Sequence, residues 1–231
     1  MFEYHSFDII DGCTMSRVFT FTPQVFKDNR GTFAEVLKEP RNTFEHEVKW
    51  FNKLDWIKQI NRSTSCGLTV RGMHAQKGDF CQAKLVEAVK GVIYDIITDA
   101  RPDSKTFGLT EAYLLDPEKQ NKLYVPRGFL HAFAVPESEK RDDAVFMYYC
   151  DDVYSKNDEV GVNPMSLLSK LVDLWEKDAK DENCAKWNLV KMLRSSEKII
   201  LSEKDCKAES YQSFMERVSR EFAETKRLWY R

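Results

Sequence analysis

The sequence predicts a mostly-β fold, a sandwich or barrel of short strands followed by helices. Apolar and aromatic runs of strand length succeed one another from residue 16 to about 155, and turn residues such as Asp28–Gly31 and Asp116-Pro117 separate them. Few helical periods interrupt them, which is typical of a sandwich or barrel. The pattern changes at Asn163-Pro164, a helix cap and first-turn signal, after which apolar residues recur at helical spacing.

The strands are expected at 18–25, 32–37, 56–61, 68–76, 83–98 (with a turn at Lys90-Gly91), 109–115, 122–136 and 144–154. One helix is expected in this part, over residues 42–53. Beyond Asn163, helices are expected through Leu168 to Trp175, more weakly over 187–193, and from Tyr211 to Trp229. We therefore divide the chain into a core at 1–160 and a helical extension at 161–231, packed on the core and containing Leu201–Asp205.

Composition excludes several classes of function. The 231 residues suit one domain with an appendage, and 35 basic against 37 acidic residues leave a net charge of -2. No general attraction to nucleic acid or to an anionic membrane is expected. No apolar stretch reaches the length of a membrane span, and the N-terminal residues do not resemble a signal peptide. The six cysteines are scattered without a CxxC pair, so we expect reduced thiols in a cytoplasmic protein.

The stretch Thr69–Val86 concentrates nitrogen-bearing side chains on apolar strands. Arg71 and His74 are an odd number of residues apart, so a regular strand would place them on opposite faces. Gly72 between them is a candidate bulge that re-aims one of them. With Lys84 on the next strand, the three residues either form the solvent face of an edge strand or line a cavity as a base and two cations.

A second informative stretch is Pro126-x-Gly128-x-x-His131, the second half-motif of cupin jelly rolls, in which the histidine often binds metal. The first half-motif would supply His-x-His, where this chain has His74-Ala75-Gln76. A catalytic first-row metal needs about three protein ligands. We therefore predict a cupin-type jelly-roll barrel with C-terminal helices, no metal and no cofactor.

An ordered series of motifs then resembles the dTDP-4-dehydrorhamnose 3,5-epimerase family, from Phe19 to Tyr154 and again at Leu201–Asp205. The matching pieces are Asp28-x-Arg30-Gly31-x-Phe33-x-Glu35, Gln59-x-Asn61, Arg71-Gly72-x-His74-x-Gln76, Lys84-Leu85-Val86, Gly91-x-x-x-Asp95, Asp99-x-Arg101, Ser104-x-x-Phe107-Gly108, Pro126-x-Gly128-x-x-His131, Tyr148, Tyr154 and Leu201-Ser202-Glu203-Lys204-Asp205. Each piece alone is weak, and taken singly these residues would be core, cap or turn residues. Their common order makes the resemblance specific.

The resemblance implies catalytic roles for four residues. The family's base falls on His74 and its orienting carboxylate on Asp205. The tyrosine that handles the proton on the opposite sugar face falls on Tyr148, although the adjacent Tyr149 remains an alternative. Lys84 falls where the family lysine faces the C4 oxygen of the sugar.

The resemblance also implies a substrate-binding set and a partner. The expected set comprises Arg71, Arg30, Glu35, Gln59, Asn61, His131, Phe33, Gln76 and Tyr154. The family is dimeric, and residues such as Arg30 reach the site from the partner's N-terminal strands. We therefore expect a homodimer with exchanged N-terminal strands.

The chemistry is consistent with these residue types. A C4 ketone acidifies the protons on C3 and C5, and an imidazole, with a pKa of about 6.5, can remove one at neutral pH. A carboxylate fixes the imidazole tautomer, and a cation at O4 stabilises the enolate. Inversion then needs an acid on the opposite face, such as a tyrosine hydroxyl.

We therefore expect an isomerase that inverts C3, C5 or both of a 4-keto-6-deoxy sugar linked to dTDP, GDP or CDP, in surface-polysaccharide synthesis. The departures from the family pattern are Ala75, Ala132, the 148–154 stretch and the long helical 161–199 region, and they leave the sugar and the nucleotide open. The alternatives are a sugar-nucleotide ketoisomerase, a non-catalytic cupin that binds a sugar nucleotide, and, more remotely, a metal-dependent cupin dioxygenase.

Overall fold

The computed structural model describes residues 2–5, 7, 18–29, 31–34, 36, 57–137, 143–178, 184–195 and 198–230. The helix expected over 42–53 lies outside these residues. Among the helices described, none is both long and apolar enough to span a membrane.

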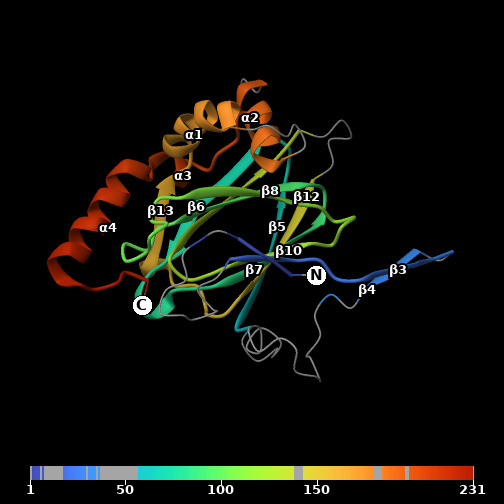
Figure 1. Cartoon of the computed structure of the whole chain (residues 1–231), viewed down its shortest axis with the longest axis horizontal. Coiled ribbons are helices and arrows are strands. Elements are labelled where there is room, and N and C mark those ends of the chain that lie inside the picture. Colours follow the sequence, from blue (N-terminus) through green and yellow to red (C-terminus); the bar gives the residue numbers. More distant parts are fainter. Residues whose placement is uncertain are drawn as a thin grey trace.

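Two six-stranded sheets face each other and form a jelly-roll sandwich (Figure 1). The first sheet has the order β1 (Phe2–Tyr4), β2 (Phe19–Phe21), β10 (Lys122–Val125), β7 (Lys84–Lys90), β12 (Ala144–Cys150), β5 (Gln59–Ser65). The second sheet has the order β14 (Glu209–Ser210), β13 (Glu159–Asn163), β6 (Thr69–Gln76), β11 (Phe129–Val135), β8 (Ile93–Asp99), β9 (Thr110–Leu115). Neighbouring strands pair antiparallel except β13 and β14, which are parallel.

The remaining elements lie outside the two sheets. A hairpin of β3 (Val25–Asp28) and β4 (Gly31–Ala34) extends away from the sandwich in Figure 1. Short 3-10 helices cover Gly78–Phe80 and Lys156–Asp158. The helices are α1 (Met165–Asp178), α2 (Ala185–Ser195), α3 (Glu203–Lys207) and α4 (Tyr211–Thr225), and they gather on one side of the sandwich.

The helices after Asn163 agree with the apolar spacing, but the last one is shorter than expected. Lys226 caps α4 in the left-handed conformation, with φ of 56°, so Trp229 lies beyond the helix. The strand β13, which crosses the expected boundary at residue 160, was missed, because Glu159–Asn163 is short and contains a glycine. The first-sheet edge strand β5 also continues past Asn61 to Ser65.

The core lies in two layers, one between the sheets and one beneath the helices. Phe129, Phe133 and Phe146 belong to the inner layer. On the outer face of the second sheet, the alanines at 75, 112, 132 and 134 share a buried cluster with Leu168, Trp175 and other helix residues. Small side chains allow the helices to approach the sheet closely, which accounts for alanine at 75, where the family pattern has an aromatic residue.

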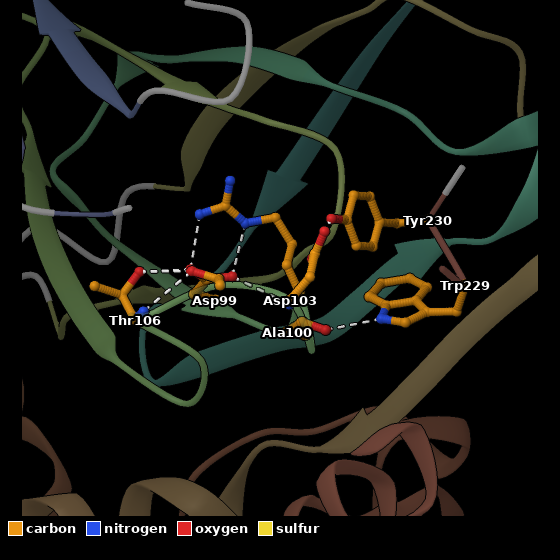
Figure 2. Close-up of polar contacts among 8 residues, drawn as sticks. Asp99, Ala100, Asp103, Thr106, Trp229 and Tyr230 are labelled. Carbon is orange, nitrogen blue, oxygen red and sulfur yellow. Dashed lines mark hydrogen bonds and ion pairs between the residues drawn. The ribbon is translucent and has the colours of Figure 1, made fainter. Parts of the chain in front are cut away.

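The C-terminal end of the described chain is fastened to the loop that follows β8 (Figure 2). The indole Nε1 of Trp229 donates to the carbonyl of Ala100 at 2.8 Å, and the hydroxyl of Tyr230 donates to Asp103 at 2.5 Å. In the same loop the Asp99 carboxylate accepts bonds from Arg101, Ser104 and Thr106. The backbone N–H of Gly78, just after β6, also donates to the carbonyl of Trp229. The tail therefore braces both β8 and the end of β6.

The predicted bulge is present in β6. His131 lies opposite His74 and Phe133 lies opposite Arg71, so the single residue Ala132 of β11 faces two residues of β6, Gly72 and Met73. Gly72 has φ of +101°, and a Cβ at this position would lie 2.5 Å from the carbonyl oxygen of His131. The bulge brings Arg71 and His74 to the same face, where both line one cavity.

We predict that Gly72→Ala destabilises the protein by at least about 2 kcal/mol, because the methyl group would meet backbone atoms and the conformation disfavours a side chain. Gly78→Ala is the matched control: φ is +58° and no atom lies within 4 Å of the added Cβ. Its expected cost is about 1 kcal/mol. Urea unfolding of both variants measures the difference, and equal losses would contradict the steric explanation.

Candidate active site

A cavity of about 740 Å³ lies between the two sheets. Strands of both sheets and the segment 200–205 contribute to its wall. The residues expected from the sequence that line it are Arg71, His74, Gln76, Lys84, Gln59, Asn61, His131, Tyr148, Tyr154 and Asp205. The fold thus gathers ten of these side chains from widely separated parts of the chain.

A short hydrogen bond in the cavity joins His74 to Asp205. The Nε2 atom of His74 lies 2.6 Å from Oδ1 of Asp205. The His74 side chain is 31% exposed and the Asp205 side chain is 4% exposed, so the imidazole is open on the cavity side while the carboxylate is enclosed. A carboxylate at Nε2 favours the tautomer that carries its proton there, which leaves Nδ1 able to accept one.

Backbone pairing brings Asp205 to His74. Ile200 forms a parallel bridge with Thr69 at the start of β6, through backbone bonds to Leu68 and Val70. Ser202 then caps α3, and its hydroxyl accepts the backbone N–H of Asp205 at 3.0 Å. Because Asp205 lies in the first turn of this capped helix, its side chain is fixed beside the strand that carries His74.

The surroundings of Asp205 hold it in the ionised form. Burial alone would raise the pKa of this carboxyl, but the hydrogen bond and charge of His74, with further bonds from Ser202 and the Gly72 backbone, lower it below its ordinary value. The carboxylate therefore remains an acceptor for the imidazole at neutral pH.

A second carboxylate, Glu159, flanks the other imidazole nitrogen. Its Oε1 lies 3.9 Å from Nδ1 of His74, and its Oε2 accepts from the Tyr154 hydroxyl at 2.8 Å and from Lys204. Burial raises the pKa of Glu159, but these contacts and His74 outweigh it and the pKa is lowered. A positive charge on the imidazole would thus have a carboxylate on each side.

The first sheet contributes Lys84 and Tyr148 to the opposite wall. Lys84 begins β7 and lies opposite Cys150 of β12. It lines the cavity, and its ammonium group makes no hydrogen bond or salt bridge to another described residue. Tyr148 also lines the cavity, whereas the adjacent Tyr149 points to the other face and donates to Glu87 at 2.7 Å. The alternation of the strand therefore selects Tyr148 as the tyrosine facing the cavity.

Tyr148 is packed on its ring and hydrogen-bonded at its hydroxyl. The ring makes edge contacts with His131, Phe133 and Phe146, and the hydroxyl lies 3.2 Å from Oγ of Ser63. Burial raises the pKa of Tyr148 above its ordinary value, and the Ser63 bond partly offsets this. The hydroxyl is therefore protonated at neutral pH and able to donate.

The polar side chains beside this wall are held by one another. The guanidinium of Arg71 donates to Ser65 Oγ at 2.9 Å and to the carbonyl of Thr64 at 3.1 Å. Gln59 donates to Asn61 at 2.8 Å. Arg71 therefore presents a fixed cation at the exposed edge of the cavity.

His131 lies beside His74 but deeper in the sandwich. Its Nε2 lies 2.8 Å from Oδ2 of Asp95, and both residues are buried. The other carboxylate oxygen, Oδ1 of Asp95, has no hydrogen-bond partner among the described residues. Two histidine–carboxylate pairs thus lie on adjacent strands, one open to the cavity and one enclosed.

One expected binding residue, Phe33, is not in this cavity: it lies on the projecting hairpin and is 65% exposed. Two others, Arg30 and Glu35, lie outside the described residues. Three residues that hold the site together were not singled out from the sequence: Ser63, Ser65 and Glu159. Asp95 and Ser202 were named there only as members of motifs, without a role. Ser63 and Ser65 continue the alternation of Gln59 and Asn61, which is the signal that could have revealed them.

Metal-binding groups do not cluster in the part of the chain that the structure describes. No set of three or more His, Cys, Asp or Glu side chains there is arranged to hold an ion. The described cysteines, Cys66, Cys81, Cys150, Cys184 and Cys206, are free thiols, as expected from their scattered positions.

The fold is a cupin-type jelly roll, and its cavity sets an imidazole–carboxylate pair opposite a lysine and a tyrosine. This combination defines the class of protein as an enzyme of acid–base chemistry. The model of the dTDP-4-dehydrorhamnose 3,5-epimerase family matches residues 13–213, and the chain belongs to this family. It is an epimerase, an isomerase that acts on carbohydrates.

Individual relatives of known name agree with this family assignment. The dTDP-4-dehydrorhamnose 3,5-epimerase of Shigella flexneri is 37% identical over 145 residues, covering 63% of this chain and 75% of the relative. The enzyme of the same name from Escherichia coli K12 is 33% identical, with 63% and 74% covered. The crystal structure of the enzyme from Elizabethkingia anophelis superposes with a TM-score of 0.66 at 29% identity, over 92% of this chain and 97% of that one.

We predict that the stability lost in Asp205→Asn depends on pH. The folded-state pKa of Asp205 lies below the ordinary value of 3.8, so its ionised form stabilises the fold above that pH, and this contribution is lost as the pH falls through the lower, folded-state pKa. The variant should be less stable by about 1.5–3 kcal/mol at pH 7, and the difference should shrink below about pH 4.

Urea unfolding across the pH range measures this difference. Asp79→Asn is the control, because Asp79 is exposed and its replacement should change stability by less than about 0.5 kcal/mol. A difference between wild type and Asp205→Asn that stays constant from pH 7 to pH 3 would contradict the stabilisation we assign to the ionised carboxylate.

Proposed function

We propose that this epimerase acts on a 4-keto-6-deoxy sugar linked to dTDP and inverts C3, C5 or both through an enolate. The observation that carries the proposal is the 2.6 Å bond between His74 and Asp205, in a cavity that Lys84 and Tyr148 face from the other sheet. These are the groups that a proton abstraction beside a carbonyl requires, namely a base, a cation for the oxygen and an acid.

Each group has one step in the proposed reaction. Nδ1 of His74 takes a proton from the carbon beside the C4 ketone, and Asp205 stabilises the resulting imidazolium through Nε2. The electron pair moves onto O4, where the Lys84 ammonium stabilises the enolate. Tyr148 returns a proton to the same carbon from the opposite face, which inverts the centre. His74 then gives its proton to solvent and Tyr148 regains one.

Relatives support dTDP as the nucleotide. The 3,5-epimerase of Legionella pneumophila was solved with dTDP-4-keto-L-rhamnose. It is 25% identical to this chain and superposes with a TM-score of 0.63, over 91% of this chain and 93% of that one. The Bacillus anthracis enzyme was solved with TDP and pyrophosphate. It is 27% identical to this chain and superposes with a TM-score of 0.63, over 89% of this chain and 99% of that one. In this chain Arg71 offers a fixed cation at the cavity edge to receive the diphosphate. His131, Gln59, Asn61, Gln76 and Tyr154 complete the proposed substrate-binding set.

The proposed function can be tested by following the incorporation of solvent deuterium into the sugar. Incubation in D₂O with the dTDP-, GDP- and CDP-linked 4-keto-6-deoxy sugars, read by mass spectrometry and NMR, should show uptake from the dTDP sugar. Label at both C3 and C5 indicates double inversion, and label at one carbon indicates a single-centre epimerase. No uptake with any of the three sugars would refute the proposal.

We predict that His74→Asn lowers this uptake by on the order of 10²–10⁴-fold, the usual contribution of a positioned base. His5→Asn is the matched control, because His5 bonds to Thr20 and stacks on Tyr113 outside the cavity. It should retain the wild-type rate. Wild-type uptake in His74→Asn would exclude this residue as the base.

We also propose a homodimer in which N-terminal strands are exchanged, with Arg30, Phe33 and Glu35 serving the partner's site. The hairpin supports this, because it extends away from its own sandwich and exposes Phe26 by 50% and Phe33 by 65%. Large apolar side chains on a projecting hairpin favour burial against a second copy.

We predict that Phe26→Ser/Phe33→Ser shifts the protein from dimer to monomer by light scattering after gel filtration. Leu174→Ser, which removes a comparably exposed apolar side chain from α1 (52% exposed), should leave the dimer intact. A wild-type monomer at assay concentration would overturn the proposal, as would a double variant that remains dimeric.

A further inference from the structure

The edge strand β5 has an unusual distribution of polar residues. Gln59, Asn61, Ser63 and Ser65 alternate toward the inside of the sandwich, whereas Ile60 points outward and is 56% exposed. Half-buried strands of antiparallel sheets ordinarily place apolar residues inside and polar residues outside. The inward face of β5 is instead polar and therefore needs polar partners inside, and each inward side chain has one.

The partners of the two serines are Arg71 and Tyr148, which both line the cavity. Ser65 accepts the guanidinium N–H of Arg71, and Ser63 lies in hydrogen-bond contact with the Tyr148 hydroxyl at 3.2 Å. Ser63 is not among the described residues that line the cavity. It therefore reaches the cavity only through Tyr148.

The direction of the Ser63 bond determines where the Tyr148 proton points. A hydroxyl has one proton and two acceptor positions. When Ser63 donates to the Tyr148 oxygen, the tyrosine proton is free to point into the cavity, and the phenolate left after donation keeps a hydrogen bond. Burial raises the pKa of Tyr148, and a bond donated by Ser63 to the phenolate opposes that effect.

We propose that Ser63 is a positioning residue that sets how often the enolate is protonated by Tyr148, and thus how often deprotonation ends in inversion. The inference rests on the proposed function. The enolate has two fates: a proton from Tyr148 on one face gives the inverted sugar, and a proton or deuteron returned by His74 on the other face gives the original sugar. Weakening the acid shifts this partition without touching the base.

The experiment compares two initial rates in D₂O with the dTDP-linked 4-keto-6-deoxy sugar. One rate is formation of inverted sugar, and the other is appearance of deuterium in recovered, uninverted sugar. In Ser63→Ala the ratio of inversion to exchange should fall about tenfold, the usual effect of losing one hydrogen bond to a developing charge. The sum of the two rates should change by less than about twofold, because His74 is untouched.

Three further variants separate positioning from structural damage. Ser63→Thr keeps the hydroxyl on a strand-compatible residue and should restore the ratio. In a Tyr148→Phe background, Ser63→Ala should have no further effect on the ratio, because the residue through which it acts is gone. Ser65→Ala, two residues along the same face, should raise KM through Arg71 and leave the ratio at the wild-type value.

A wild-type ratio in Ser63→Ala would overturn the inference. The inference would also be overturned if Ser63→Ala lowered the ratio of inversion to exchange equally in the wild-type and Tyr148→Phe backgrounds. Ser63 would then act by a route other than the Tyr148 hydroxyl. These outcomes can be told apart from a failure of the proposed function itself. In that case the wild-type protein would show neither inversion of the sugar nor exchange of deuterium. Ser169→Ala, which removes an exposed hydroxyl from α1, is the remote control and should match wild type in both rates.

Discussion

The hydrogen bond between His74 and Asp205 joins two parts of the chain that are 131 residues apart. Its geometry depends on three local features: the Gly72 bulge that turns His74 inward, the bridge between Thr69 and Ile200, and the Ser202 cap that holds Asp205 in the first turn of α3. The first two features are backbone arrangements, and the third is a side-chain cap that fixes a backbone N–H. The imidazole is therefore positioned mainly by the fold.

The two sheets divide the chemistry between them. The second sheet supplies His74 and Glu159, the helix α3 supplies Asp205, and the first sheet supplies the lysine, the tyrosine and the serines behind them. In the reaction we propose, a substrate between the sheets would meet the base on one side and the acid on the other, as inversion of a carbon requires. The helices cover the outer face of the second sheet, where alanines leave room for them, and the base-bearing strand is supported from behind.

Much of the fold could be inferred from the sequence, because the strands are bounded by strong turn signals and the helix after Asn163 has a clear cap and apolar stripe. The pairing of His74 with Asp205 came from motif order, since no local pattern brings residues so distant together. The helix end at Lys226 and the strand β13 were missed: the first depends on one left-handed residue, and the second on pairing with β6. Ser63 and Glu159 escaped notice because their importance lies in their partners, which only the three-dimensional structure reveals.

The separation of His74 from Asp205 also has a consequence for biosynthesis. A ribosome that adds about 5–20 residues per second needs roughly 7–25 s to extend the chain across the 131 residues between them. During that time the chain carries His74 without the carboxylate that orients it, while the strands from β7 to β13 are still being made. The hydrogen bond between the two residues can form only when the C-terminal segment emerges and docks on β6, so a chain that ends before Asp205 has most of the strands but not the oriented imidazole.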